Sequence, residues 1–277
     1  MPRIWLCADD YGISPGVNTG IRDLVVRGRL NATSVLVVAP SCCRSEAMLL
    51  DALNRVTQQV AIGLHVALTA PFRPLSTGFA PSRKGAFLSL SATVQCALLH
   101  RFDAQALARE LAHQLDAFSR LFGRLPDFID GHQHVHLLPQ IRDAVLRATK
   151  ERVPNVWLRQ CGRIGPLVRR LADPKGFFLD LLSRGFRRRA VALGLRTNPA
   201  FAGTYDFAED ADFHALFARF LARLPDASVV MCHPGFVDAE LQRLDPVTTV
   251  REREHEFLAG DAFPAILASH ALTLGVL

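Results

Sequence analysis

The sequence predicts an α/β fold with parallel strands inside and helices outside, either a β/α barrel or a doubly wound sheet. Short apolar runs, such as residues 3–8, 33–40 and 59–66, alternate with segments of helical periodicity. This alternation is typical of a parallel sheet covered by helices. Polar residues follow the ends of several runs, as they do where barrel strands end at an active site. No internal repeat or linker is evident, so we expect one domain over residues 1–277.

The first apolar run, residues 3–8, is a predicted strand that leads directly into two adjacent acids, Asp9 and Asp10. Like charges repel at such short spacing, and a bound cation relieves that repulsion. A serine before a proline then starts a helix at Ser14, and apolar spacing extends this helix to about Arg27. A plain loop in which an aspartate caps a helix stays an alternative for the acid pair.

The run 59–66 is a predicted buried strand that carries His65 at its end. The segment 70–92 after it is rich in Pro, Gly, Ser and Arg and has little periodicity. Loops of this length are uncommon unless they are functional or disordered, so we expect this excursion to shape a cleft beside His65. A helix with one apolar face follows over Ala104–Phe122 and ends at Gly123.

Three histidines, His132, His134 and His136, stand at alternate positions behind Asp130. In an extended chain these four side chains share one side. Histidine is the commonest metal-binding side chain, and a carboxylate often fixes its tautomer. We therefore expect a metal site here, and three unrelated polar residues in a turn remain the alternative.

The C-terminal half continues the alternation of strands and helices. One strand ends at Arg159, and a later strand reaches His233, which stands before a Pro-Gly turn. A loop between them carries Phe201 and Tyr205. Ligand sites are lined by aromatic side chains and a few placed polar groups, so we expect these two rings and Arg159 to bind substrate. Simple anchoring of the loop is the alternative for the two aromatic residues.

These residue types together suit metal-assisted hydrolysis. One carboxylate and two imidazoles make a three-ligand shell for a divalent ion, with positions left open for water and substrate. A second carboxylate as base and a separate imidazole as acid would complete the machinery for cleaving an amide or ester. An isolated structural histidine remains the alternative for His233.

The bulk properties restrict location and partners. The net charge is +6, and much of the excess lies within 163–196, where 177–196 mixes Phe and Leu with arginines. Such a segment is typical of an amphipathic helix at a membrane surface or a subunit contact. No nucleic-acid recognition motif accompanies the charge, so we expect no specific nucleic-acid binding. We find no transmembrane segment and no signal peptide, and we expect a cytoplasmic protein with reduced cysteines.

Four segments resemble the successive motifs of the YdjC-like carbohydrate deacetylases: ADDYGISPGVNTGI, IGLHVALT, FIDGHQHVHLLPQI and MCHPGF. They follow in the right order over nearly the whole chain. The resemblance implies a (β/α)-barrel-like deacetylase fold and a homodimer. It also implies metal-dependent removal of the acetyl group from an N-acetylated sugar, of the chitooligosaccharide or N-acetylglucosaminyl lipid type, with one divalent ion, Mg²⁺ or Zn²⁺, per chain.

The same resemblance assigns roles to the motif residues. The metal ligands would be Asp10, His65 and His132, the general base Asp9 and the general acid His233. Asp130, His134 and His136 would have orienting or structural roles around them. We expect Asp9 to be ionised and His233 to be protonated in the working enzyme. A sugar- or metabolite-binding barrel without turnover, and a metal-dependent esterase or phosphatase, are the alternative functions.

Overall fold

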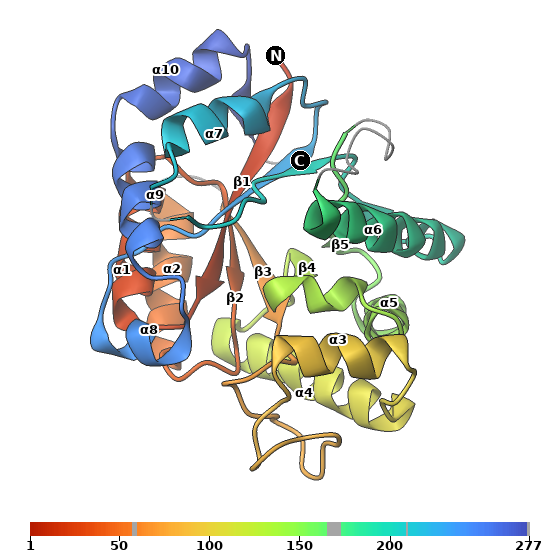
Figure 1. The fold of residues 1–277 in the computed structure, drawn as a ribbon. Coiled ribbons are helices and arrows are strands. Elements are labelled where there is room, and N and C mark those ends of the chain that lie inside the picture. Colours follow the sequence, from red (N-terminus) through yellow and green to blue (C-terminus); the bar gives the residue numbers. More distant parts are fainter. Residues whose placement is uncertain (57–59, 165–172, 209, 276–277) are drawn as a thin grey trace.

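The computed structural model describes residues 1–56, 60–164, 173–208 and 210–275. Parallel strands form one sheet at the centre of the molecule, with helices on the outside (Figure 1). The strands are β1 (Arg3–Tyr11), β2 (Ala32–Val35), β3 (Ala61–Val66), β4 (Phe128–Gly131), β5 (Trp157–Leu158), β6 (Arg196–Thr197), β7 (Phe201–Ala202), β8 (Ser228–Cys232) and β9 (Thr273–Leu274).

The order of the strands defines an open barrel. Along the sheet it is β6-β5-β4-β3-β2-β1-β8-β7, with β9 paired to β1, and the pairs are parallel. Among the described residues the outer strands β6 and β7 do not pair with each other, so the barrel is not closed. The predicted α/β fold, with parallel strands inside and helices outside, is confirmed.

Helices surround the strands on the outside of this open barrel. They are α1 (Pro15–Val26), α2 (Arg44–Val56), α3 (Leu90–Leu98), α4 (Ala104–Phe122), α5 (Ile141–Arg152), α6 (Pro174–Ala192), α7 (Phe213–Leu221), α8 (Ala239–Leu244), α9 (Thr249–Ala259) and α10 (Ala262–Ser269), with the 3₁₀ helix η1 (His132–Leu137) after β4. Figure 1 shows α1, α2, α8 and α9 along one side of the strands and α3, α4, α5 and α6 around the other.

Local sequence signals explain several helix ends. The Ser14 hydroxyl accepts a hydrogen bond from the N–H of Val17 at 3.3 Å, which caps α1 at the predicted position. Asp103 caps α4 in the same way through the N–H of Ala106, at 2.6 Å. Gly123 ends α4 in the left-handed region, at φ 70°, as predicted.

The register of the sheet gathers polar side chains at the carboxyl ends of the strands. His65 on β3 pairs with Asp130 on β4, and side chains of paired residues on parallel strands point to the same face. Asp9 and Asp10 occupy the end of β1, where the ladder with β2 is irregular. Asp10 has φ 69°, a conformation that costs a non-glycine residue free energy.

Four elements differ from the sequence-based expectation. The first strand, predicted over 3–8, continues to Tyr11, so Asp9 and Asp10 lie within β1, and the predicted loop 197–207 contains the strand β7, which carries Phe201. The strand predicted over 33–40 ends at Val35, because residues 36–40 turn away from the sheet. The end of the predicted excursion 70–92 is helical, since α3 begins at Leu90, capped by Ser89. Across the described residues, no helix is both long and apolar enough to span a membrane.

Candidate active site

Asp10, His65 and His132 form a buried cluster that fits a divalent cation. One ligand atom from each lies within 4.8 Å of the others. The Asp10 Oδ1 is 2.9 Å from Nδ1 of His132 and 3.4 Å from Nε2 of His65. Burial opposes ionisation of Asp10, but the charges of His132 and Arg251 outweigh it and hold its pKa well below the usual value. A carboxylate and two imidazoles are a suitable donor set for a divalent metal ion.

Asp130 orients the first of these imidazoles. It is fully buried, and its Oδ1 accepts a hydrogen bond from Nδ1–H of His65 at 2.6 Å. The other ring nitrogen, Nε2, then keeps its lone pair and faces Asp10. A carboxylate behind a histidine fixes the tautomer that a metal ion requires.

Asp9 is held by an arginine rather than by the histidines. Arg159 donates to both oxygens of this carboxylate, at 3.0 Å from Nη1 and 2.7 Å from Nη2, and also forms an ion pair with Asp130. The Ser34 hydroxyl donates to Asp9 at 3.1 Å. Burial opposes ionisation of Asp9, but the charge of the Arg159 guanidinium outweighs it and lowers its pKa, so Asp9 is ionised at neutral pH.

Arg159 does not have the environment that we predicted for a substrate-binding residue. Its side chain is 1% exposed, and the guanidinium is engaged by Asp9 and Asp130. A second group of potential metal ligands consists of Cys7, Asp9 and Asp130, whose ligand atoms lie within 4.8 Å of one another. Arg159 forms ion pairs with both carboxylates of this group. The arginine compensates their charge, and burial raises the pKa of the Cys7 thiol, so this group is not a second metal site.

The three alternate histidines do not share one side of an extended chain, and that prediction is wrong. The strand β4 stops at Gly131, and Gln133 and His134 have φ values of 52° and 58°, which coil the segment into η1. His132 therefore joins the metal cluster, while His134 contacts the Cys161 sulfur at 3.4 Å. His136 is fully buried, and its Nε2–H donates to the main-chain oxygen of Arg159 at 2.8 Å.

Burial makes these two remaining histidines neutral. It lowers the pKa of His134 to about 4 and that of His136 to about 3. His136 also packs edge-on against Phe186, with ring centroids 5.5 Å apart. The hydrogen bond from His136 to the Arg159 main chain links η1 to the residue that directly follows β5.

His233 follows β8 directly beside the end of β1, because Cys232 pairs with Ala8 in these two parallel strands. Its main-chain N–H donates to Oε2 of Glu254 at 2.5 Å. Burial lowers the pKa of its ring to about 4, although the charges of Asp10 and Asp9 act in the opposite direction. The ring is therefore neutral at pH 7 in the free protein, which differs from the protonated state expected of the working enzyme.

A cavity of about 1090 Å³ opens onto these groups. Asp9, Asp10, His132, His134 and His233 line it together with Phe201, Tyr205 and apolar residues of α6 and α7. The loop 197–207 therefore borders the site, as predicted. From the excursion 70–92, Leu90 lines the cavity and the Phe72 ring lies edge-on to that of His132, at 5.6 Å.

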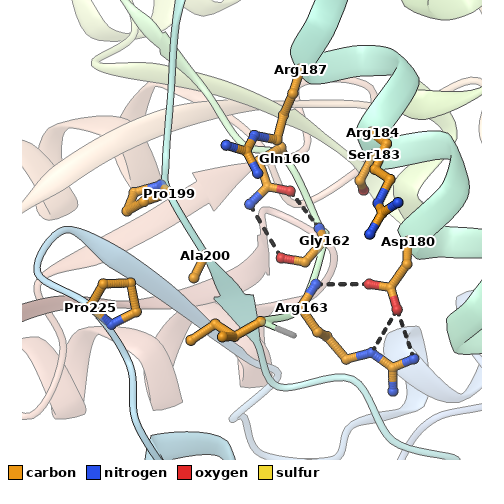
Figure 2. Close-up of a pocket in the computed structure, with 11 residues that line it drawn as sticks. Gln160, Gly162, Arg163, Asp180, Ser183, Arg184, Arg187, Pro199, Ala200 and Pro225 are labelled. Atoms are coloured by element: carbon orange, nitrogen blue, oxygen red, sulfur yellow. Dashed lines mark hydrogen bonds and ion pairs between the residues drawn. The ribbon is translucent and has the colours of Figure 1, made fainter. Parts of the chain in front are cut away.

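A smaller cavity of about 280 Å³ lies against α6 and is lined by none of the predicted site residues (Figure 2). Figure 2 shows Arg163 directed at Asp180, with which it forms a salt bridge of 3.0 Å. Arg163 also lines the larger cavity. Most of the predicted site residues thus line the larger cavity, whereas His65, Asp130, His136 and Arg159 are buried and do not line it.

Comparison with known proteins identifies the family. The family model of YdjC-like proteins matches residues 3–269. The chain belongs to the YdjC-like family. It is 29% identical to a chitooligosaccharide deacetylase of Serratia marcescens over 97% of this chain and 95% of that one.

Solved structures place the YdjC-like chain in the same fold. A protein of Enterococcus faecalis, named for cellobiose-phosphate cleavage, superposes with a TM-score of 0.77 at 20% identity, over 99% of this chain and 97% of that one. The lactam utilization protein of Thermus thermophilus gives a TM-score of 0.53 at 13% identity, over 99% and 100% of the chains. At these identities the likeness concerns the fold alone.

Two charged residues of this YdjC-like site were not predicted from the sequence. Arg251 and Glu254 both lie on α9 and are almost fully buried. Arg251 donates to Oδ2 of Asp10 at 2.7 Å. A signal existed for Glu254, because it stands four residues from Val250 and four from Leu258, on the apolar face of that helix. A carboxylate on such a face needs a buried partner.

Proposed function

We propose that this YdjC-like protein is a metal-dependent carbohydrate N-deacetylase, a hydrolase that removes the acetyl group from an N-acetylated sugar. The observation that carries the proposal is the buried cluster of Asp10, His65 and His132, of which Asp10 and His132 line the same cavity as Asp9 and His233. The relative named as a chitooligosaccharide deacetylase supports the reaction and the substrate class. A chitooligosaccharide or an N-acetylglucosaminyl lipid is the substrate type that we expect.

Asp10, His65 and His132 would hold one divalent ion, Mg²⁺ or Zn²⁺. Such an ion, when bound, supplies a Lewis acid for the acetyl carbonyl and lowers the pKa of water. Two contacts orient the ligand atoms for this ion. Asp130 keeps the His65 lone pair directed at the cluster, and Arg251 holds the second oxygen of Asp10, leaving Oδ1 toward the imidazoles.

Asp9 would act as the general base. Its lowered pKa keeps it ionised, and the paired hydrogen bonds from Arg159 fix the plane of its carboxylate. A positioned base of this kind accepts the proton of an attacking water as the bond to the acetyl carbon forms. Arg159, in this proposal, positions the base and does not contact the sugar.

His233 would be the general acid that protonates the leaving amine. It must take up a proton from solvent water in the loaded site before it can donate one, because burial keeps its ring neutral in the free protein. Negative charge that develops on the acetyl oxygen beside the ring favours the imidazolium. Tyr205 lines the cavity and offers a face for the sugar ring. Phe201, for which we predicted the same role, also lines the cavity but is 1% exposed and packs edge-on against His134.

Acetate release from a panel of N-acetylated sugars, measured with and without added divalent ion, tests this function. The proposal expects ion-dependent acetate release from at least one oligosaccharide or glycolipid of the panel. Tight sugar binding without acetate release would favour a binding barrel instead. Release of phosphate or of acetate from O-esters alone would favour an esterase or phosphatase.

The helix α6 is the part of the chain for which we predicted a peripheral membrane or subunit contact. It exposes Phe178, Leu181 and Val191 together with arginines such as Arg188. An apolar and basic surface of this kind suits either an anionic membrane or the second copy of a homodimer. Both partners remain predictions.

A further inference from the structure

Glu254 is a buried carboxylate that the proposed chemistry does not use. It lies on α9 with no exposed surface. Its Oε2 accepts the main-chain N–H of His233 at 2.5 Å, and its Oε1 accepts the hydroxyl of Tyr205, also at 2.5 Å. Burying a carboxylate costs several kcal/mol unless strong hydrogen bonds compensate it. Both oxygens of Glu254 are therefore committed to residues at the cavity wall.

The imidazole of His233 has no comparable support. Among the described residues none forms a hydrogen bond with its ring, and Nδ1 is buried without a partner. The Phe207 ring meets it edge-on, with centroids 5.2 Å apart. In many enzymes an acid histidine is oriented by a carboxylate bonded to its ring. Here the carboxylate holds the main chain of the histidine instead.

The second partner of Glu254 belongs to the loop on the other side of this ring. Tyr205 packs against Phe207 with centroids 4.4 Å apart, and Phe207 in turn packs against His233. This loop lies so close to β8 that residue 203 must be a glycine. Its φ is 108°, and a Cβ there would clash with the main-chain oxygen of Met231. One carboxylate thus joins α9, the end of β8 and the cavity loop.

We propose that Glu254 is a positioning residue, whose carboxylate fixes the His233 main chain and the Tyr205 hydroxyl so that the acid imidazole faces the bound amide. This inference rests on the proposed deacetylase function. Glu254 would position the acid, His233, as Arg159 positions the base, Asp9. Tyr205 is then held at its hydroxyl end, which leaves its ring to border the sugar site.

Two neighbouring glutamates provide a matched comparison. Glu252 lies on the same helix, is exposed, and accepts the main-chain N–H of Val237 at 3.0 Å. It therefore makes the same kind of bond to the same segment, four residues beyond His233. Replacing it removes an equal charge without releasing the acid.

Kinetics of alanine and glutamine variants test the positioning role. Glu254→Ala should lower kcat on an N-acetyl sugar by about tenfold to a hundredfold, with a smaller loss on nitrophenyl acetate, whose leaving group needs no proton. Glu254→Gln should recover most of the rate, because its amide can accept from the His233 N–H and donate to Tyr205. Glu252→Ala should stay within about twofold of the native rate. If Glu254→Ala does not fold, Glu254→Asp, which is too short to reach both partners, replaces it.

A double variant separates positioning from general support of the fold. Because Glu254 acts through His233, adding Glu254→Ala to His233→Ala should cause little further loss of kcat. Equal losses on amide and ester, or a full additional loss in the double variant, would show that Glu254 only stabilises the structure and would overturn the inference.

Hydrogen exchange of the His233 main-chain amide tests the contact without relying on activity. The Glu254→Ala variant should exchange this amide at least about tenfold faster than the native protein, and Glu252→Ala should leave it unchanged. If the native protein released no acetate from any sugar, the proposed function would fail while this measurement kept its meaning. Unchanged exchange at His233 in Glu254→Ala would overturn the inference in either case.

Discussion

The metal and base cluster, which comprises Asp9, Asp10 and His65, and the acid His233 are held in different ways. In the metal and base cluster, side chains bond directly to side chains: Arg159 to Asp9, Asp130 to His65 and Arg251 to Asp10. At His233, Glu254 bonds to the main chain of the histidine, and no described residue bonds to the imidazole itself. The first arrangement fixes charges before substrate arrives, and the second leaves a ring free to exchange a proton.

The difference follows from what each group has to do. A metal ligand must keep its charge and direction throughout a reaction, and a base must be ionised and aligned before it accepts a proton. Buried arginines and a second carboxylate suit both needs. An acid must change its protonation state, and a ring without a permanent partner can do so when substrate alters its surroundings. Four sets of variants test this contrast, and they follow in order of decreasing expected effect.

The choice of ligand within the histidine triplet gives the largest expected effect. His132→Ala should abolish binding of the divalent ion, because a three-ligand shell cannot lose an imidazole and keep its affinity. His134→Ala should bind the ion normally, since its ring contacts Cys161 and lies outside the cluster. Elemental analysis after dialysis measures both. Loss of the ion in His134→Ala, with retention in His132→Ala, would reverse the assignment.

Replacement of the base should stop catalysis without removing the metal. Asp9→Asn should lower kcat by about a hundredfold or more, the usual scale for a positioned base. The ion content should stay native, because the ligand cluster consists of other residues. Acetate release and elemental analysis on the same sample check the two parts. A variant that loses its ion would make Asp9 a ligand instead of a base.

The two buried arginines should have separable effects. Arg159→Lys keeps the charge but loses the paired hydrogen bonds to Asp9, so kcat should fall by about tenfold while ion affinity changes little. Arg251→Lys should act on ion affinity first, because its partner is Asp10. Ion titrations and kinetics of the two variants, side by side, measure this. The same pattern in both would show that the arginines act on the site as a whole.

Glu254 should give the smallest effect, a change in how stability depends on pH. Burial raises its pKa from 4.5 to about 7. Between these pH values the folded chain keeps a proton that the unfolded chain has lost, so this group lowers the free energy of unfolding as pH rises. Glu254→Gln should therefore gain about 1–3 kcal/mol relative to the native protein between pH 4.5 and pH 7. Urea unfolding at both pH values measures the gain, with Glu252→Gln as control, and parallel curves would contradict the account.

Much of the metal and base cluster could be predicted from the sequence. Its residues follow apolar runs at separate points of the chain, and the rule that parallel strands end at one edge brings them together. The cap at Ser14 and the helix end at Gly123 could be predicted too, because such signals are local. The histidine segment could not, since its left-handed residues Gln133 and His134 break the alternation that an extended chain would have.

The environments of the charged groups could not be predicted from the sequence, for a different reason. A pKa depends on burial and on neighbours from distant segments, and neither is present in a local pattern. The neutral state of His233, the burial of Arg159 and the role of α9 all arise from contacts across the fold. Arg159 lies 150 residues from Asp9 along the chain, so spacing gives no hint of their bond.

Titration of the metal-free protein with a divalent ion tests directly whether acetate release depends on one bound metal ion. Acetate release from an N-acetylated oligosaccharide should be absent at the start and should rise in proportion to added ion until one ion per chain is bound. The His65→Ala variant, treated in the same way, should stay inactive. Full acetate release by the metal-free protein, or a plateau that His65→Ala also reaches, would contradict the account of a metal-dependent deacetylase built on Asp10, His65 and His132.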